Sequence, residues 1–572
     1  MKFTFAPVVM AAAVSIANPV MAQEPVGYWE GMLSIGPTDL QIGISIERGD
    51  DGELRGTADS PDQGAFDIPL DNIDVADNRL RFDVPSIGAS YEAEWSTSEE
   101  GWDGTFRQGG MELPLTLTAG ERPERDVAAP LPAEWTMPSD EQIARIIEER
   151  IAQRDGNGMV VGVISDTGVR IVAGGPEGQA AFDRTTLFEI GSITKVFTAL
   201  VLADMANEGL VSLDDPVAKY LPESASVPER GGKQITLRNL SRHDSGLPRL
   251  PSNMAPSDST NPYADYTEQD MLAFLSGHTL TRDIGSQYEY SNLGVGLLGY
   301  ALARAAGMDF EELVRTRLLD ELEMSDTAIS LSTDQDARMA IAHDIYNRPT
   351  SRWDLPTFAG AGALRSSADD VLKLMQAALD PQSPIAAQVK LSLADQREAP
   401  GFRAGLGWMV VPAPAGEVIM HGGGTGGFRS HMALQPDTGR GVVVMTNSAV
   451  EPSAQDVAMH ILLGAPLAET GPVPEAPQAV ARDEIELSPA QLDRVSGTYQ
   501  MSPGVEMTIA RKGDQLLAAI TGQGAFEIFP RAPLEFFWRA VNAEIIFEES
   551  DGTITGARFS QDGLNVAMEK VN

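Results

Sequence analysis

Residues 23–120 contain segments in which every second residue is hydrophobic. Apolar and polar or small residues alternate from Leu40 to Ile46, which is typical of a half-buried strand. A turn-forming run, Gly49 to Gly52, follows directly, and similar short strands recur along residues 23–120. The pattern predicts a small all-β domain, a sandwich or barrel, over residues 23–120.

The other end of the chain has the same character. Apolar residues alternate from Val505 to Ile509, and Lys512-Gly513-Asp514 is a turn signal. We predict a second all-β domain over residues 486–572, which weakly resembles a lipocalin-like domain. Proline-rich segments at residues 121–138 and 466–485 predict extended linkers on either side of the region between them.

The central region, residues 139–465, mixes strand and helix periods. A long helix is expected over Ser192–Asn207, with Gly209 as its C-terminal stop. Strands are expected at both ends of the region, and a helix closes it. These are a hairpin of Met159–Ile164 and Val169–Ala173, four strands at Leu406–Val411, Glu417–His421, Arg429–Gln435 and Gly441–Asn447, and a helix at Gln455–Leu463. This order predicts an α/β (α+β) fold in which the two ends of the region meet in one antiparallel sheet.

Residues 1–22 have the features of a signal peptide. Lys2 precedes an apolar run from Phe5 to Ala17, and Val20-Met21-Ala22 resembles a cleavage site with small residues. The run is too short to span a bilayer, and we find no other segment long and apolar enough to do so. The expectation is therefore an exported protein, periplasmic or extracellular in a bacterium.

Composition narrows the possible functions. A chain of 572 residues is too long to fold around a single hydrophobic core, so several domains are expected. With 42 basic and 82 acidic residues the net charge is -40, which disfavours binding to nucleic acid. The chain has no cysteine, which excludes disulfides, thiol nucleophiles and thiolate-bound metals.

The first chemical motif is Ser192-Ile193-Thr194-Lys195. A serine and a lysine three residues apart share one face of a helix. A serine hydroxyl is a weak nucleophile until a base takes its proton, and a desolvated lysine can be that base. Gly191 before it permits close backbone approach. By itself this short pattern is equally consistent with a surface serine and lysine.

Two later motifs add weight to the first. Tyr290-Ser291-Asn292 places a phenol and an amide within two residues, where a tyrosinate could relay protons and an amide could hold a carbonyl. The segment His421–Phe428 has five glycines in eight residues, which lets a substrate approach the backbone. A core tyrosine with a capping asparagine, and a flexible glycine loop, are the structural alternatives.

In this order the motifs resemble the serine β-lactamase and penicillin-binding protein superfamily, with its S-x-x-K, Y-x-N and K-T-G elements. The segments Arg242–Pro248 and Ala359–Ser367 are also similar to that superfamily. The resemblance covers most of residues 139–465. It implies an antiparallel sheet flanked by helices, together with an all-helical subdomain.

The resemblance also implies roles for individual residues. Ser192 would attack the substrate carbonyl and become acylated, Lys195 would accept its proton, and Tyr290 would act as general acid or base. The backbone N–H groups of Ser192 and Gly424 would form the oxyanion hole. The residues expected to bind the substrate are Asn292, His421, Gly422 and Gly423.

One position departs from the superfamily pattern. His421 occupies the place of the K-T-G lysine, and a histidine is only partly charged near neutral pH. Recognition of an anionic β-lactam should then be weaker. We therefore favour an esterase or a D-amino-acid peptidase or carboxypeptidase acting through a Ser192 acyl-enzyme. A class C-like β-lactamase is the alternative enzyme, and a non-catalytic penicillin-binding sensor or scaffold is the alternative of another class.

A zinc hydrolase is the main rival chemistry. The chain has six histidines, and none of them forms an H-E-x-x-H or another closely spaced ligand pair. We expect no metal and no cofactor. The expected partner is a small ester, peptide or β-lactam substrate. The oligomeric state, and the role of the two flanking β-domains, stay open.

Overall fold

The structure is a computed structural model, and its parts are described one at a time. It describes residues 24–571 with gaps at residues 36–37, 50, 62–64, 77, 86–88, 109–110, 123–130, 133, 153, 176–181, 255, 475–483, 503–504, 521–524, 540–542, 551 and 562–563. The expected signal peptide, residues 1–22, lies outside the described residues. Within them, no helix has both the length and the apolarity needed to cross a membrane.

The first folded part is a nine-stranded antiparallel sheet in the order β4-β3-β2-β1-β9-β8-β7-β6-β5. Alternate residues of its strands point inward, and Trp29, Trp95 and Trp102 pack edge to face among them. The Tyr91 hydroxyl bonds to two backbone carbonyls at 2.8 Å each, which satisfies it in the core. The strands are β1 Gly27–Ile35, β2 Thr38–Arg48, β3 Leu54–Ser60, β4 Ala65–Pro69, β5 Asp71–Ala76, β6 Arg79–Val84, β7 Ala89–Ser96, β8 Gly101–Gln108 and β9 Met111–Ala119.

The central part contains an eight-stranded antiparallel sheet in the order β11-β10-β19-β18-β17-β16-β15-β14. β10 pairs with β19, so the beginning and the end of this part meet in one sheet. The strands are β10 Met159–Ser165, β11 Gly168–Gly174, β14 Arg397–Ala399, β15 Phe402–Ala404, β16 Met409–Ala413, β17 Gly416–Gly424, β18 Arg429–Gln435 and β19 Arg440–Thr446. A separate two-stranded sheet pairs β12 Leu187–Glu189 with β13 Arg365–Ser367.

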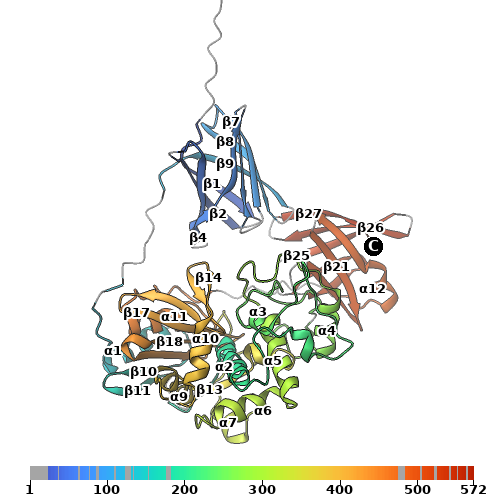
Figure 1. The fold of residues 1–572 in the computed structure, drawn as a ribbon. Helices are drawn as coiled ribbons and strands as arrows, with labels where there is room; N and C mark the ends of the chain where they lie inside the picture. Colours follow the sequence, from blue (N-terminus) through green and yellow to red (C-terminus); the bar gives the residue numbers. More distant parts are fainter. Residues whose placement is uncertain are drawn as a thin grey trace, which may run out of the picture. The chain divides into compact units, whose positions relative to one another are not determined.

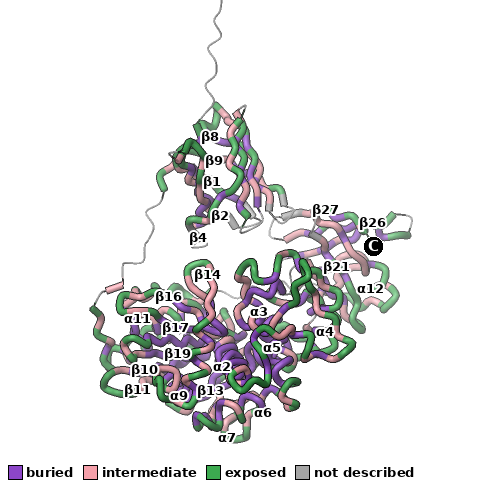
Figure 2. The backbone as a smooth tube through the Cα atoms, viewed as in Figure 1, coloured by how far each residue is buried: buried purple, intermediate pink, exposed green. Residues whose placement is uncertain are grey.

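Helices cover both faces of the central sheet (Figure 1). Val161 and Val163 of β10 pack toward α1 and α11, whereas Val160 and Ile164 join the larger core with α2 and α9. This alternation explains why β10 is apolar at nearly every position. Figure 2 shows the resulting buried strands and the buried α2 within this part. The helices are α1 Asp140–Ile151, α2 Thr194–Asn207, α3 Leu237–Ser241, α4 Glu268–Gly277, α5 Asn292–Ala306, α6 Phe310–Val314, α7 Thr333–Ala337, α8 Ala359–Gly362, α9 Ala368–Leu379, α10 Ala386–Ala394 and α11 Ala454–Leu463.

The helix expected over Ser192–Asn207 begins slightly later than its pattern suggested. Gly191–Ile193 form a short 3-10 helix, η3, and α2 proper starts at Thr194. The expected stop is confirmed, because Gly209 follows the last turn with φ +73°. Almost every residue of α2 is buried, so its hydrophobic residues face all sides.

The last part of the chain is a closed eight-stranded barrel, β20 to β27, preceded by the short helix α12 Pro489–Val495. Tyr499 is fully buried inside it and donates to the Val495 carbonyl at 2.6 Å. The strands are β20 Gly497–Ser502, β21 Val505–Lys512, β22 Gln515–Ile520, β23 Ala525–Ala532, β24 Glu535–Phe537, β25 Ala543–Ser550, β26 Thr553–Gln561 and β27 Leu564–Lys570.

Candidate active site

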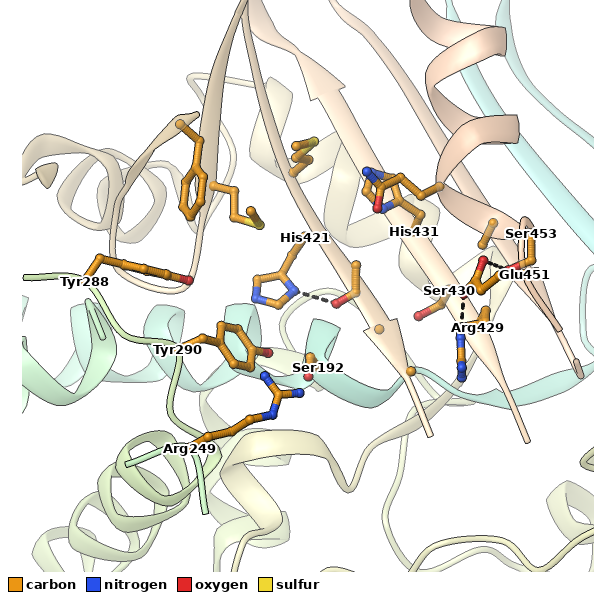
Figure 3. A pocket seen from close by; sticks show the side chains of 18 residues that line it. Ser192, Arg249, Tyr288, Tyr290, His421, Arg429, Ser430, His431, Glu451 and Ser453 are labelled. Carbon is orange, nitrogen blue, oxygen red and sulfur yellow. Dashed lines mark hydrogen bonds and ion pairs between the residues drawn. The ribbon is translucent and has the colours of Figure 1, made fainter. Parts of the chain in front are cut away.

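A cavity of about 520 Å³ lies at the end of β17 in the central part (Figure 3). It brings together residues from η3, from the segment before α5, and from β17 and β18. Among the residues expected from the sequence, Ser192, Tyr290 and His421 to Gly424 line it. Lys195 and Asn292 lie directly behind Ser192 and contact each other.

Ser192 owes its position to the glycine before it. Gly191 has φ +49°, a left-handed conformation that side chains disfavour. A Cβ atom on Gly191 would also lie 2.7 Å from the backbone nitrogen of Gly424. The turn that carries Ser192 therefore packs directly against the end of β17.

Lys195 is buried at the centre of the site, with 1% of its surface exposed. Its Nζ lies 2.9 Å from Ser192 Oγ, 2.9 Å from Asn292 Oδ1 and 2.7 Å from the carbonyl oxygen of Ala361. The two carbonyl oxygens can only accept hydrogen bonds. A neutral amine has two hydrogens and one lone pair, so these oxygens occupy both hydrogens. The lone pair is then directed at the hydroxyl of Ser192.

The surroundings favour this neutral form. Burial is the main reason that the pKa of Lys195 lies well below its usual value, and the positive charge of Arg249 lowers it further. No carboxylate contributes to this pKa. A lysine whose pKa is lowered in this way is a competent base for a serine hydroxyl near neutral pH.

Tyr290 lies over Lys195, with Nζ 4.8 Å from the centre of its ring. Burial raises the pKa of Tyr290 to about 12, although a hydrogen bond with Ser192 and the charge of Arg249 act in the opposite direction. The phenol is therefore protonated at neutral pH. The tyrosinate considered from the sequence is wrong for this structure, because desolvation disfavours the anion, and Tyr290 can act there as a proton donor.

Local contacts hold Tyr290 in place just before α5. Ser291 caps that helix, its Oγ accepting from Gly294 N at 2.8 Å. The Ser291 N–H donates to His243 Nδ1 at 3.0 Å, and the His243 ring stacks on Tyr290 with centroids 4.5 Å apart. Burial, together with nearby Lys195, holds the pKa of His243 well below its usual value. His243 thus contacts Tyr290 as a neutral packing partner.

The side-chain amide of Asn292 contacts two neighbouring residues. Its Oδ1 accepts from Lys195, and its Nδ2 lies 3.5 Å from the Tyr263 hydroxyl. The expectation was that the amide orients the substrate. In this structure its oxygen is already used by Lys195, so only an N–H of the amide can serve a substrate carbonyl.

The glycines of β17 are required by close packing. A Cβ atom on Gly423 would lie 1.9 Å from the carbonyl oxygen of Ile190, immediately before η3. The Ser430 hydroxyl donates to the same carbonyl at 2.9 Å. β16 pairs with β17 only as far as Met409 opposite Met420, so among the described strands no partner covers the other edge of His421 to Gly424. That edge, with its backbone groups, borders the cavity.

His421 differs from the sequence expectation in its charge. Its ring is buried, and its Nδ1 lies 2.7 Å from the Gly422 carbonyl. Burial first, and then the charge of Lys195, lower the pKa of His421 to about 3. The side chain is therefore neutral near pH 7, and the expected partial charge is wrong. The ring faces Tyr290, with centroids 6.3 Å apart.

Among the cavity residues that sequence reasoning did not assign to the site are Arg249 and His431. Arg249 directly follows the segment that resembles the superfamily, and its guanidinium lies over the Tyr290 ring at 5.1 Å. In Figure 3 it points toward Ser192. His431 lines the cavity from β18. A basic residue adjoining a recognised motif, and a histidine one strand away from another motif histidine, were the available signals.

In the part of the chain that the structure describes, no group of three or more histidine, aspartate or glutamate side chains is arranged so that it could hold a metal ion.

Comparison with known proteins assigns the class. The Beta-lactamase family model matches residues 143–465, more than half of the chain, so the chain belongs to this family and is a serine hydrolase. The D-alanyl-D-alanine-carboxypeptidase/endopeptidase AmpH of Escherichia coli K12 is 32% identical over 281 residues, which are 46% of this chain and 71% of that protein.

Two further proteins are similar to this chain. Penicillin-binding protein 4* of Bacillus subtilis is 25% identical over 403 residues, 66% of this chain and 86% of that protein. A solved β-lactamase/D-alanine carboxypeptidase from Yersinia pestis, complexed with citrate, matches 55% of this chain and 93% of its own, with 27% identity and a TM-score of 0.47.

Proposed function

We propose that this protein is a D,D-peptidase that cleaves the amide bond of a D-alanyl-D-alanine-type peptide through an acyl-enzyme on Ser192. The observation that carries the proposal is the set of contacts around buried Lys195, whose Nζ lies 2.9 Å from Ser192 Oγ, 2.9 Å from Asn292 Oδ1 and 2.7 Å from the Ala361 carbonyl oxygen. The name of the AmpH relative supports the choice of substrate.

The proposed reaction starts when Lys195 takes the proton of Ser192 and the hydroxyl oxygen attacks the scissile carbonyl. The oxyanion would be held by the backbone N–H groups of Ser192 and Gly424, and the close approach of Gly191 to the Gly424 nitrogen supports this role. Tyr290, protonated, would donate a proton to the departing amine and recover it through Lys195. Water, activated in turn, then hydrolyses the ester and frees Ser192.

Arg249 supplies the positive charge that His421 lacks. The other arginine of the cavity, Arg429, is paired with Glu451 at 2.7 Å and also donates to two backbone carbonyls. Within the described part of the chain, Arg249 forms no salt bridge, and its guanidinium lies over the Tyr290 ring. We infer that its guanidinium binds the C-terminal carboxylate of the peptide.

The Arg249→Gln variant tests this role. For a peptide ending in a free carboxylate, we expect kcat/KM to fall about 10- to 100-fold, because a hydrogen bond to a charged group contributes about 1.5–3 kcal/mol. The same peptide as its C-terminal amide should change much less. The ratio of the two values is the measurement, because any effect of Arg249 on the pKa of Lys195 acts on both substrates alike.

Arg429→Gln is the matched control, since it also removes a guanidinium from the cavity. It should leave the preference for the carboxylate in place. If Arg249→Gln keeps the wild-type ratio, another group recognises the carboxylate.

A comparison of three substrates tests the peptidase proposal itself. We expect release of D-alanine from N-acetyl-D-alanyl-D-alanine with a higher kcat/KM than the hydrolysis of benzylpenicillin or of a short-chain ester such as p-nitrophenyl acetate. The expectation rests on the name of the AmpH relative and, for the ester, on Arg249, because p-nitrophenyl acetate has no carboxylate that the guanidinium could bind. Faster turnover of benzylpenicillin would favour the β-lactamase alternative, and activity on the ester alone would favour an esterase.

Export belongs to the same proposal, because residues 1–22 have the features of a signal peptide and a peptide of the cell envelope would be met outside the cytoplasm. N-terminal sequencing of protein recovered from the culture supernatant or the cell envelope tests it.

A further inference from the structure

The end of β17 has two faces, and the residues already described use only one of them. Gly422 is the Cα partner of His431 on β18, so the two residues share one face of the sheet. His421, the neighbour of Gly422, points to the opposite face, toward Tyr290. A Cβ atom on Gly422 would lie 3.1 Å from His431 Nδ1. The missing side chain at position 422 therefore leaves the His431 ring open toward the edge of β17.

His431 has hydrogen-bonding capacity that the protein does not use. It is 3% exposed, and neither ring nitrogen has a hydrogen-bond partner within the described part of the chain. A buried polar group left without a partner is unfavourable, because it has lost its hydrogen bonds to water and gained none in the protein. The ring nevertheless lines the same cavity as Ser192. An unpaired polar side chain at this place is a group that a ligand can satisfy.

The surroundings of His431 define the chemistry that it can bind. Burial alone lowers its pKa to about 4, so the ring is neutral at pH 7 and offers one donor and one acceptor. Apolar side chains, Met409 and Met420, line the same cavity. The charged residues nearby, Arg429 and Glu451, neutralise each other. This environment suits an uncharged group that both donates and accepts, and disfavours a carboxylate.

Resting on the proposed peptidase function, we propose that Gly422 and His431 form a side-chain subsite that binds a carboxamide of the peptide substrate on the second face of β17. The carboxamide N–H would donate to the unprotonated nitrogen of the neutral imidazole, or the carboxamide oxygen would accept from the ring N–H, depending on the tautomer. The subsite would select between peptides that differ only in the side chain next to the scissile bond.

Isosteric substrates test the subsite. Asparagine and leucine have nearly the same shape, so N-acetyl-D-alanyl-D-asparagine is compared with N-acetyl-D-alanyl-D-leucine, and N-acetyl-D-asparaginyl-D-alanine with N-acetyl-D-leucyl-D-alanine. The wild-type protein should prefer the asparagine peptide about 10-fold in kcat/KM within one of the two pairs, since one net hydrogen bond contributes about 1 kcal/mol or slightly more.

Two variants then remove the preference. His431→Phe retains a ring of similar size without hydrogen-bonding nitrogens, and Gly422→Ala places a methyl group against Nδ1. Both should reduce the asparagine-to-leucine ratio to about 1. Met432→Leu, a core change on the opposite face of β18, should keep the wild-type ratio. Thermal unfolding of each variant verifies that it is folded. If His431→Phe does not fold, the ratio measured for Gly422→Ala decides whether the subsite exists.

The outcomes separate the two proposals. A wild-type ratio near 1 in both pairs, with all four dipeptides hydrolysed, overturns the subsite and leaves the peptidase function standing. A preference that survives both His431→Phe and Gly422→Ala also overturns it. Failure of the wild-type protein to hydrolyse any dipeptide overturns the peptidase function and the subsite together.

Discussion

Replacement of Ser192 by alanine should abolish acylation. A fluorophosphonate should add to one residue of the wild-type protein, and the intact mass of Ser192→Ala should stay unchanged after the same treatment. With a peptide substrate, kcat should fall by a factor on the order of 10⁶, as is found when the nucleophile of a serine hydrolase is removed. The reason is that, among the described residues, Ser192 carries the hydroxyl that is hydrogen-bonded to Lys195, the proposed base.

Ser453→Ala is a suitable control because Ser453 lines the same cavity and its hydroxyl donates to Glu451 at 3.0 Å. This variant should still form the adduct. Benzylpenicillin adds a second readout, since a lasting penicilloyl adduct on the wild-type protein supports the peptidase assignment. If folded wild-type protein forms no adduct with either reagent, the non-catalytic sensor or scaffold becomes the better description of the cavity.

Replacement of Lys195 by methionine should have the second largest effect. General base catalysis contributes about 10²- to 10⁴-fold, and we expect the rate of acylation to fall within or beyond that range. Methionine has a similar length and is apolar, so it fits a buried position. It cannot accept the proton of Ser192, and it leaves Asn292 Oδ1 and the Ala361 carbonyl without their donor.

The pH dependence of the wild-type protein follows from the same residue. Neutral Lys195 is the active form, so kcat/KM should fall as the pH drops through its lowered pKa. The pKa of His421 at about 3 and of His431 at about 4 lie below the usual working range, and that of Tyr290 at about 12 lies above it. Among these four groups, an acidic limb of the profile well below the ordinary pKa of a lysine therefore belongs to Lys195.

Measurement of acylation by Lys195→Met across this pH range is the direct check, and its profile should lose the inflection. Lys390→Met, a change at an exposed position of α10, should keep both the rate and the profile. A Lys195→Met profile that retains the wild-type inflection would assign the base to another residue.

Much of the site could be found in the sequence because the chemistry of the class needs short motifs. Ser192 and Lys195 are three residues apart, and this spacing alone places them on one face of a helical turn. The glycines from Gly422 to Gly424 predicted that a substrate approaches the backbone here, whereas the packing of Gly423 against the Ile190 carbonyl is visible only in the folded chain. The hydrophobic pattern also predicted the strands β17 to β19. Alternate residues of each strand face the hydrophobic cores on the two sides of the sheet.

Charge at the site was decided only by the tertiary structure. His421 and Tyr290 have ordinary pKa values near 6.5 and 10 in water, and no sequence pattern specifies how much water they lose. Burial makes His421 a neutral ring and keeps Tyr290 protonated, which changes the roles expected for both. Desolvation depends on every element packed around a group, so it has no local signature.

Contacts between residues that are distant in the chain could not be predicted from the sequence either. The sequence by itself determined the nucleophile motif, the Y-x-N motif and the strand that carries the glycines, because each is specified by neighbours within a few residues. Only the folded chain brings Arg249 over Tyr290, and only the register of β17 against β18 places His431 beneath Gly422. The physical reason is that pairing and packing join segments whose separation along the chain no local pattern records.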